Sequence, residues 1–215
     1  MPEIEMLCIA NSEKLGGRCV AGMRLDDKSL IRPVSDTKDG ELNASACQLN
    51  VGRAVQPLDV VRVGLRRPEP RRHQPENWIA TDKQWVLVDQ LTPQTALLTL
   101  QKMSVEGPNL FGTCTDHVTW AQIQESGVQA SLAIVKAVAP KFFPRKGKRR
   151  AAFDLRGTCY DLSIKFHIEL PADGKRIHRS QASWYFTISL GEPLPEKDNA
   201  CFKLIAGAIE IPAGS

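Results

Sequence analysis

The stretch CIANSEKLGGRCVAGMRLDDKSLIRPVS (residues 8–35) is the part of the sequence that best indicates the fold. It contains short apolar runs separated by polar or glycine-rich residues. Such an arrangement is typical of antiparallel β-strands joined in a meander. Gly16 and Gly17 favour a tight turn between the first two runs, because glycine adopts positive φ without a steric penalty from Cβ. We therefore expect the chain to begin with a β-meander.

The same stretch places three cations, Lys14, Arg18 and Arg32, near the expected strand ends. Cations beside small polar side chains and turn amides are suited to hold a phosphate or a carboxylate. The stretch lacks the GxxxxGK[ST] pattern of a P-loop and the GxGxxG pattern of a dinucleotide site. A plain hairpin whose cations are solvated is the alternative interpretation.

Several motifs of the chain resemble those of a known family. The segment CIANSEKLGGRCVAG, followed by LIRPVS, resembles the opening of bacterial proteins described as dual-OB-domain-containing. Further matches lie in chain order at ENW (76–78), YDL (160–162), SLGEP (189–193) and CFKLIAGAI (201–209). The resemblance spans nearly the whole chain, and its first and last motifs are the most specific. It implies two OB folds and a nucleic-acid-binding role in bacterial defence or mobile-element contexts, and it brings no catalytic residues with it.

Composition bounds the class of protein. A chain of 215 residues forms one large or two small domains, and an apolar fraction of 42% suffices for a folded core. The net charge of +4 is compatible with a polyanionic partner. No apolar run approaches the roughly 18 residues of a membrane span, and the first residues do not form a signal peptide. We therefore expect a cytoplasmic protein that has no membrane partner.

Cysteine and histidine spacing gives no sign of a metal or cofactor site. The six cysteines are scattered, and no CxxC or CxxH pair has the spacing of zinc ligands. Free thiols are favoured over disulfides, since most cysteines lie in apolar runs. Cys114 and His117 are close in the sequence TCTDH (113–117), but nothing places a third group beside them. We expect no metal and no cofactor, and a non-enzymatic role is favoured over an enzymatic one.

The pattern along the chain favours a mainly β fold with a few helices, built as two OB-like barrels. We expect a first β unit at 1–75, a partly helical connector at 76–127 and a second β unit at 128–215. In the connector, Thr92 and Pro93 are the N-cap and first residue of a helix that continues to about Lys102. A second helix is expected at 119–124, ended by Gly127. A single β-sandwich that spans both halves is the structural alternative.

The second β unit has about five expected strands. They are predicted near residues 131–138, 151–155, 158–166, 183–190 and 202–211, with a hairpin turn at Arg156-Gly157. The sequence Gly191-Glu192-Pro193-Leu194-Pro195 is expected to break the fourth of these strands. Five short strands without a long helix between them suit a small Greek-key barrel.

Two basic segments are candidate surfaces for a phosphate backbone. The first, RRPEPRRH (66–73), is extended because of its two prolines, and it contributes the cations Arg66, Arg67, Arg71 and Arg72. A solvated connector is the alternative interpretation of this segment. The second, KFFPRKGKRR (141–150), has six cations and no acid. Its candidate residues are Phe142, Phe143, Arg145, Lys146, Lys148, Arg149 and Arg150.

Aromatic side chains accompany the cations in the second half of the chain. Cations contact phosphates and aromatic rings stack on bases, so the segment 141–150 has the composition of a single-strand-binding loop or hairpin. Adjacent residues on a strand face opposite sides, so we do not expect both phenylalanines to point inward. The alternative is a solvated loop that its phenylalanines anchor to the core. A third candidate group comprises Lys175, Arg176, Arg179 and Trp184, and at most one of Trp184 and Tyr185 is expected to be a stacking platform.

These features lead to one favoured function and two others. The favoured hypothesis is a nucleic-acid-binding module, with single-stranded DNA or RNA as its partner. The alternative is a nucleotide or modified-base sensing or processing domain whose ligand lies at the stretch Gly16-Gly17-Arg18. A third hypothesis is a module that recruits a partner protein of the same system. Salt dependence separates the first from the others, because polyanion binding releases counterions.

The absence of metal-ligand spacing generates a first prediction. Metal catalysis requires ligands that converge and leave an open coordination position, and the sequence has no HxxxH, CxxC or DxD pattern. We expect elemental analysis of the purified protein to find no stoichiometric transition metal, and a chelator to leave the melting temperature unchanged. A nuclease activity that is lost on chelation and on substitution of Cys114 or His117 would contradict this expectation.

Overall fold

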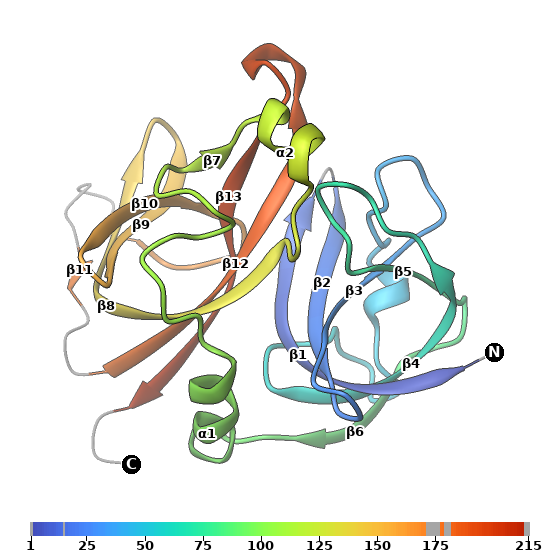
Figure 1. The fold of residues 1–215 in the computed structure, drawn as a ribbon. Helices are drawn as coiled ribbons and strands as arrows, with labels where there is room; N and C mark the ends of the chain where they lie inside the picture. The colour runs from blue at the N-terminus through green and yellow to red at the C-terminus, as the bar shows by residue number, and fades with distance from the viewer. Residues whose placement is uncertain (1, 15, 171–176, 179–181, 213–215) are drawn as a thin grey trace.

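The structure of the protein is a computed structural model, which describes residues 2–14, 16–170, 177–178 and 182–212. The chain forms two β-barrels that lie side by side, the first from its N-terminal half and the second from its C-terminal half (Figure 1). Strands account for most of the regular structure, and two short α-helices lie between the barrels in sequence. The expected mainly β fold with a few helices is confirmed.

The first barrel closes through five strands. They are β1 (Glu3–Lys14), β2 (Gly17–Arg24), β3 (Leu30–Val34), β4 (Asp59–Pro68) and β5 (Asn77–Ala80), in the order β1-β2-β3-β5-β4. Pairing of β1 with β4 closes the barrel, and β3 and β5 are parallel while the other pairs are antiparallel. A sixth strand, β6 (Val86–Gln90), extends the sheet beside β4. A single 3-10 turn, Ser45–Cys47, lies in the connection from β3 to β4.

The second barrel repeats this arrangement. Its strands are β8 (Leu132–Arg145), β9 (Lys148–Leu155), β10 (Thr158–Ile164), β12 (Ala182–Leu194) and β13 (Ala200–Pro212), in the order β8-β9-β10-β13-β12. Pairing of β12 with β8 closes it, and β10 and β13 form the one parallel pair of its five-stranded path. Two-residue strands add to it: β7 (His117–Val118) beside β13 and β11 (Ile177–His178) beside β8. A second 3-10 turn, Pro195–Lys197, joins β12 to β13.

The shared strand order identifies both units. A five-stranded Greek-key barrel in which strands follow the order 1-2-3-5-4 and the third and fifth are parallel is an OB fold. Two OB-like barrels are therefore confirmed, and the single β-sandwich that was weighed as an alternative is wrong.

The two helices begin and end where their capping residues predict. In α1 (Pro93–Met103) the Thr92 side chain accepts a hydrogen bond from the Thr95 amide. In α2 (Trp120–Ser126) Thr119 and Gln122 form a reciprocal capping box, and Gly127 at φ 66° ends the helix. Among the residues that the structure describes, no helix has the length and apolar character needed to cross a membrane.

Strand pairing shows which parts of the expected connector belong to the barrels. Strands β5 and β6 fall within residues 76–127 but pair with β3 and β4 of the first sheet, and β7 pairs with β13 of the second. The first barrel therefore extends beyond residue 75. The helices α1 and α2, with the loop between them, are the segment that leads from one barrel to the other.

One predicted strand end is wrong. Gly191-Glu192-Pro193 does not break β12, which continues to Leu194 and pairs again with β13 at Pro193 and Leu194. The pairing shifts register between Leu190 and Pro193, so the extra residues form a bulge. A bulge tolerates a proline because its amide nitrogen lies outside the regular ladder.

Apolar side chains cluster inside each barrel and between the barrels. The first barrel encloses Met6, Val20 and Trp85, and the second encloses Phe153 and Phe186. A third cluster joins the barrels: it contains Ile9, Ala10 and Ala21 from the first barrel and Leu132, Ile134, Tyr185, Ala206, Ile209 and Ile211 from the second. Burial of apolar surface is the main source of stabilisation between packed sheets. The barrels are thus docked through an apolar interface.

The closeness of this docking generates a prediction at Gly207 of β13. A Cβ atom at this position would overlap the carbonyl oxygen of Ile9 and the backbone of Ala10 in β1. We expect Gly207→Ala to lower the free energy of unfolding by about 1–3 kcal/mol, because the two strands must separate to admit the methyl group. Urea denaturation measures the change. Gly107→Ala, where a methyl group meets no atom within 4 Å, is the matched control, and equal stabilities of the two variants would contradict the prediction.

Candidate nucleic-acid interface

Two of the three cations of the opening stretch, Lys14 and Arg32, contact the second barrel. Arg32 of β3 is only 3% exposed, and its Nη2 donates to Ser131 Oγ at 3.0 Å and to Ser189 Oγ at 3.1 Å in the second barrel. Burial lowers the pKa of the Arg32 guanidinium. Arg18 of β2 is half-buried, and its backbone pairs with Leu42. Arg32 is therefore closed off by the second barrel.

The anion that this region was expected to bind is a side chain of the same protein. Glu192, in the bulge of β12, has its Oε1 2.7 Å from Lys14 Nζ and 3.7 Å from Arg71 Nη1, and its Oε2 2.7 Å from His73 Nε2. Burial by itself would raise the pKa of Glu192, but the hydrogen bonds from His73 and Lys14 outweigh it and lower the pKa to about 2. Lys14, Arg71 and His73 are thus already engaged by an anion of the protein itself.

The loop from β4 to β5 is held against the second barrel along its length. The Glu76 carboxylate accepts hydrogen bonds from Ser131 Oγ at 2.7 Å and from the Leu132 amide at 3.1 Å. Gln74 Nε2 donates to the Leu190 carbonyl at 3.2 Å, and Arg72 Nη1 donates to the Gln124 carbonyl at 2.8 Å. These contacts place the predicted basic segment 66–73 beside the interface.

Most cations of this segment have acidic partners. Arg66 and Arg67 form ion pairs with Asp36 at 3.3 Å and 3.2 Å, and Arg67 also pairs with Glu69 at 3.1 Å. Arg71 faces Glu192, as described above. The segment is thus not a row of unpaired cations, although Arg66, Arg67 and Arg72 remain exposed to solvent.

The two barrels differ in how much of the ligand-binding face they expose. In OB folds, the face of strands 2 and 3 and the loops 1–2 and 4–5 bind oligonucleotides. In the first barrel this face is β2–β3, and Ala21, Met23 and Arg32 on it are all buried. In the second barrel it is β9–β10, whose outward residues are exposed or half-buried: Arg150, Ala152, Asp154, Cys159, Asp161 and Ser163. The first barrel uses this face for docking, and the second leaves it open.

The β8–β9 hairpin is loop 1–2 of the second barrel and carries the basic segment 141–150. Its two-residue turn has positive φ at both positions, Lys146 at 51° and Gly147 at 69°. Lys146 and Lys148 are exposed and form no ion pair with any residue that the structure describes. The turn therefore projects two unpaired cations at the edge of the open face.

Three arginines of this hairpin are held by neighbouring strands. Arg150 Nη1 donates to Ser163 Oγ at 3.0 Å and Nη2 to the Asp161 carbonyl at 2.6 Å. Arg145 Nη1 is 2.9 Å from Asp161 Oδ2, and Arg149 Nη1 donates to the Phe166 carbonyl at 3.0 Å. Their guanidinium groups have fixed orientations, unlike the two lysines.

The aromatic residues expected to stack on bases are buried instead. Phe142 and Phe143 are 0% and 5% exposed, so the expectation that they would not both point inward is wrong. Strand β8 bends at a bulge between Val138 and Lys141 and pairs with β11 at Phe142. The Phe142 ring centroid lies 5.1 Å from that of Trp184 in the barrel core.

Trp184 and Tyr185 do face opposite sides of β12, but both sides are covered. Trp184, 5% exposed, lies in the core of the second barrel, while Tyr185, 1% exposed, lies in the cluster between the barrels. A stacking role for Trp184 is therefore wrong in this structure. Lys175, Arg176 and Arg179 lie outside the described residues.

Local sequence patterns do not connect the residues that complete the interface between the barrels. Glu192 and His73 are an isolated acid and an isolated histidine, 119 positions apart, and Ser131 and Ser189 are ordinary serines. Only the unusual Gly-Glu-Pro sequence marks the position of Glu192. The six cysteines are free thiols, as expected. Within the described residues no three His, Cys, Asp or Glu side chains gather as metal ligands.

Two OB barrels in one chain, one docked through its ligand face and one with that face open, define a dual-OB protein. The chain belongs to the family described as "Dual OB-containing domain", whose model matches residues 4–208. A comparison with curated proteins and one with solved structures found no match.

The low pKa of Glu192 generates a prediction about acid stability. Because the pKa in the folded protein is about 2 and the ordinary value is 4.5, the stabilisation is complete above pH 4.5 and is lost as the pH falls toward 2. We expect Glu192→Gln to be about 2–3 kcal/mol less stable than the unaltered protein at neutral pH. Between pH 4.5 and 2 the variant should lose less stability than the unaltered protein, because it lacks the carboxylate that titrates there. Urea denaturation at a series of pH values measures both effects.

The exposed Glu196 offers the matched control for this experiment. Glu196→Gln is expected to follow the pH profile of the unaltered protein. If Glu192→Gln also followed that profile, the ion pairs between the barrels would not be the source of the acid sensitivity.

Proposed function

We propose that the protein is a nucleic-acid-binding module that favours single strands of DNA or RNA. The observation that carries this proposal is the open β9–β10 face of the second barrel with a cationic β8–β9 hairpin at its edge. This is the surface that OB folds use for oligonucleotides, and cations at its rim supply phosphate contacts.

The contacts on this surface determine what kind of recognition it supports. Lys146 and Lys148 reach solvent without a partner among the described residues, and Arg150 is oriented by Asp161 and Ser163. The outward residues of β9 and β10 include no aromatic ring. Binding would therefore depend on the phosphate backbone more than on base stacking, which favours low sequence specificity and a steep dependence on salt.

In this proposal the first barrel is a scaffold. Arg32 and Lys14 hold the two barrels together, so neither is assigned to the nucleic acid. The alternative site at Gly16-Gly17-Arg18 is not retained, because the Arg18 amide and carbonyl pair with Leu42 at 2.7 Å and 2.9 Å and close the turn. A bacterial, defence-related setting and a partner protein of the same system stay predictions from the sequence resemblance.

Fluorescence anisotropy tests the proposal directly. Labelled single strands and duplexes of DNA and RNA would be titrated with the protein at a low and a high salt concentration. We expect single strands to bind more tightly than duplexes, and affinity to fall steeply with salt. Absence of binding to every nucleic acid at low salt would contradict the proposal and favour a protein partner.

The two exposed lysines of the β8–β9 hairpin generate a prediction about salt dependence. In the double variant Lys146→Gln/Lys148→Gln, the slope of log affinity against log salt for a single strand should decrease by about 1.4, or roughly 0.7 for each lost phosphate contact. Lys28→Gln/Lys83→Gln, which removes two exposed cations from the first barrel, is the charge-matched control. Equal slopes for the two double variants would remove the hairpin from the binding surface.

A further inference from the structure

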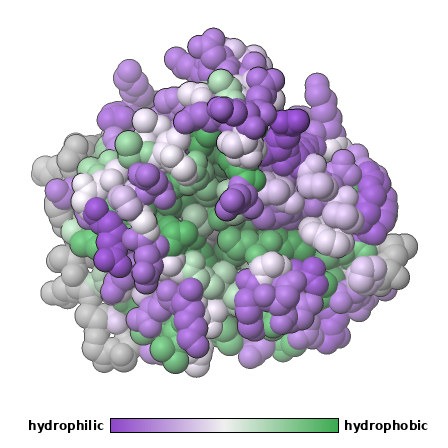
Figure 2. Space-filling view, in the orientation of Figure 1, coloured by the Kyte–Doolittle hydropathy of each residue, from purple (hydrophilic) through white to green (hydrophobic). Residues whose placement is uncertain are grey.

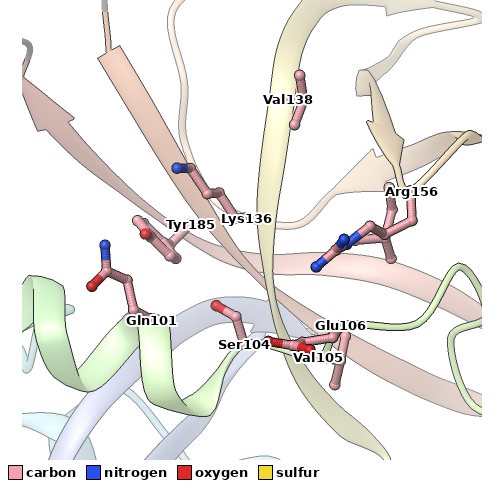
Figure 3. Close-up of a pocket in the computed structure, with 9 residues that line it drawn as sticks. Gln101, Ser104, Val105, Glu106, Lys136, Val138, Arg156 and Tyr185 are labelled. Atoms are coloured by element: carbon pink, nitrogen blue, oxygen red, sulfur yellow. The ribbon is translucent and has the colours of Figure 1, made fainter.

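A cavity of about 310 Å³ lies between α1, strand β8 and the turn that joins β9 to β10 (Figure 3). In the orientation of Figure 1, Figure 2 shows hydrophobic side chains gathered in the middle of the visible face, with hydrophilic ones around them. The volume is at the lower end of the range for small-molecule sites. The charged residues that line the cavity are Glu106, Lys136 and Arg156. None of them belongs to the ion pairs between the barrels or to the Lys146–Lys148 hairpin.

Two valines form the apolar part of this cavity. Val138 lies two residues after Lys136 on the outward side of β8, opposite to the core residues Val135 and Ala137, and is 55% exposed. Val105, which follows α1, also lines the cavity and is 37% exposed. Two valines open to a concave surface suit the apolar body of a ligand.

Three charged side chains around the cavity are unpaired within the part of the chain that the structure describes. Lys136 of β8, Arg156 of the β9–β10 turn and Glu106 after α1 are exposed and form no ion pair with any other described residue. In Figure 3, Lys136 lies on one side of β8, and Arg156 and Glu106 lie on the other. Two cations and one carboxylate favour a ligand with a net negative charge that also carries a hydrogen-bond donor.

Buried and polar groups form one edge of the cavity. Tyr185 lines the cavity and is 1% exposed, and burial raises the pKa of its hydroxyl, an effect that the Gln101 side chain opposes. The amide of Gln101 lies beside this hydroxyl (Figure 3) and is its partner, although the two atoms do not meet ordinary hydrogen-bond geometry. Tyr185 and Gln101 together present a polar edge to a ligand.

We propose that this cavity binds a nucleoside monophosphate, either free or as the terminal nucleotide of a strand. Arg156 would hold the phosphate, and Val105 and Val138 would contact the base or sugar. Lys136, on the other side of β8, would add positive charge without contacting the phosphate. Glu106 would accept a hydrogen bond from an N–H or O–H group, and Tyr185 and Gln101 would bond to the polar edge. The ligand thus matches the size, the charge and the mixed apolar and polar lining of the cavity. This proposal does not rest on nucleic-acid binding by the hairpin.

Nuclear magnetic resonance titration with the four ribonucleoside 5′-monophosphates tests the proposal. We expect saturable shifts at residues around the cavity, and at least about tenfold weaker binding of the matching nucleoside and of inorganic phosphate. Arg156→Gln should weaken binding about tenfold, since it removes one charge-assisted contact. Lys136→Gln should weaken binding less, since it removes only a more distant charge. Val138→Trp should abolish binding by filling the cavity, and its exposed position keeps the fold intact.

Controls separate this site from the hairpin and the two sources of the ligand from each other. Lys102→Gln, a neutralised exposed cation on α1 that does not line the cavity, should bind like the unaltered protein. Lys146→Gln/Lys148→Gln should also retain mononucleotide binding. Competition by a 5′-phosphorylated oligonucleotide, but not by its unphosphorylated form, would identify the terminal nucleotide of a strand as the source. Absence of saturable shifts, or shifts that Arg156→Gln and Val138→Trp leave unchanged, would overturn the proposal.

Discussion

The contact between the two barrels is the constraint on which the rest of the structure depends. An apolar cluster around Ile9 and Tyr185 supplies its area, and two charged groups, Arg32 and Glu192, cross its polar side. A buried charge is costly unless it is paired and hydrogen-bonded, so the partners of these groups must be in register when the barrels dock. Burial of the apolar surface drives the association of the two barrels. The ionic contacts are satisfied in only one relative orientation of the barrels.

This docking gives two similar barrels different roles. Both have the strand order of an OB fold, yet the β2–β3 face of the first is covered and the β9–β10 face of the second is open. Glu192 is bound by Lys14, Arg71 and His73 as an external anion would be. The ligand face of one barrel has thereby become a protein–protein interface within the chain. Functions that require an exposed surface fall to the other barrel.

Bulges change the direction of side chains in two strands without ending them. The bulge in β12 lies at Glu192, whose carboxylate contacts Lys14 of the first barrel. The bulge in β8 lies between Val138 and Lys141 and precedes Phe142 and Phe143. Both phenylalanines are buried, whereas a regular strand would have placed them on opposite faces.

The sequence by itself determined the elements and their class. Thr92, Thr119 and Gly127 mark the helix ends through local hydrogen bonds and backbone conformation, and the short apolar runs mark the strands, because these signals depend on neighbouring residues. The cationic hairpin at 145–148 was also visible from composition, and its exposure agrees with that pattern.

Only the tertiary structure decided which surfaces are free. Arg32 and Lys148 are equally basic in the sequence, yet one is buried between the barrels and the other reaches solvent. The difference comes from residues far away in the chain, such as Glu192 and Ser189, which no local pattern connects to Arg32. Whether a charged side chain is buried is therefore decided by the docking of the two barrels. The physical reason is that packing between distant strands, and not spacing along the chain, determines which charges lose their contact with water.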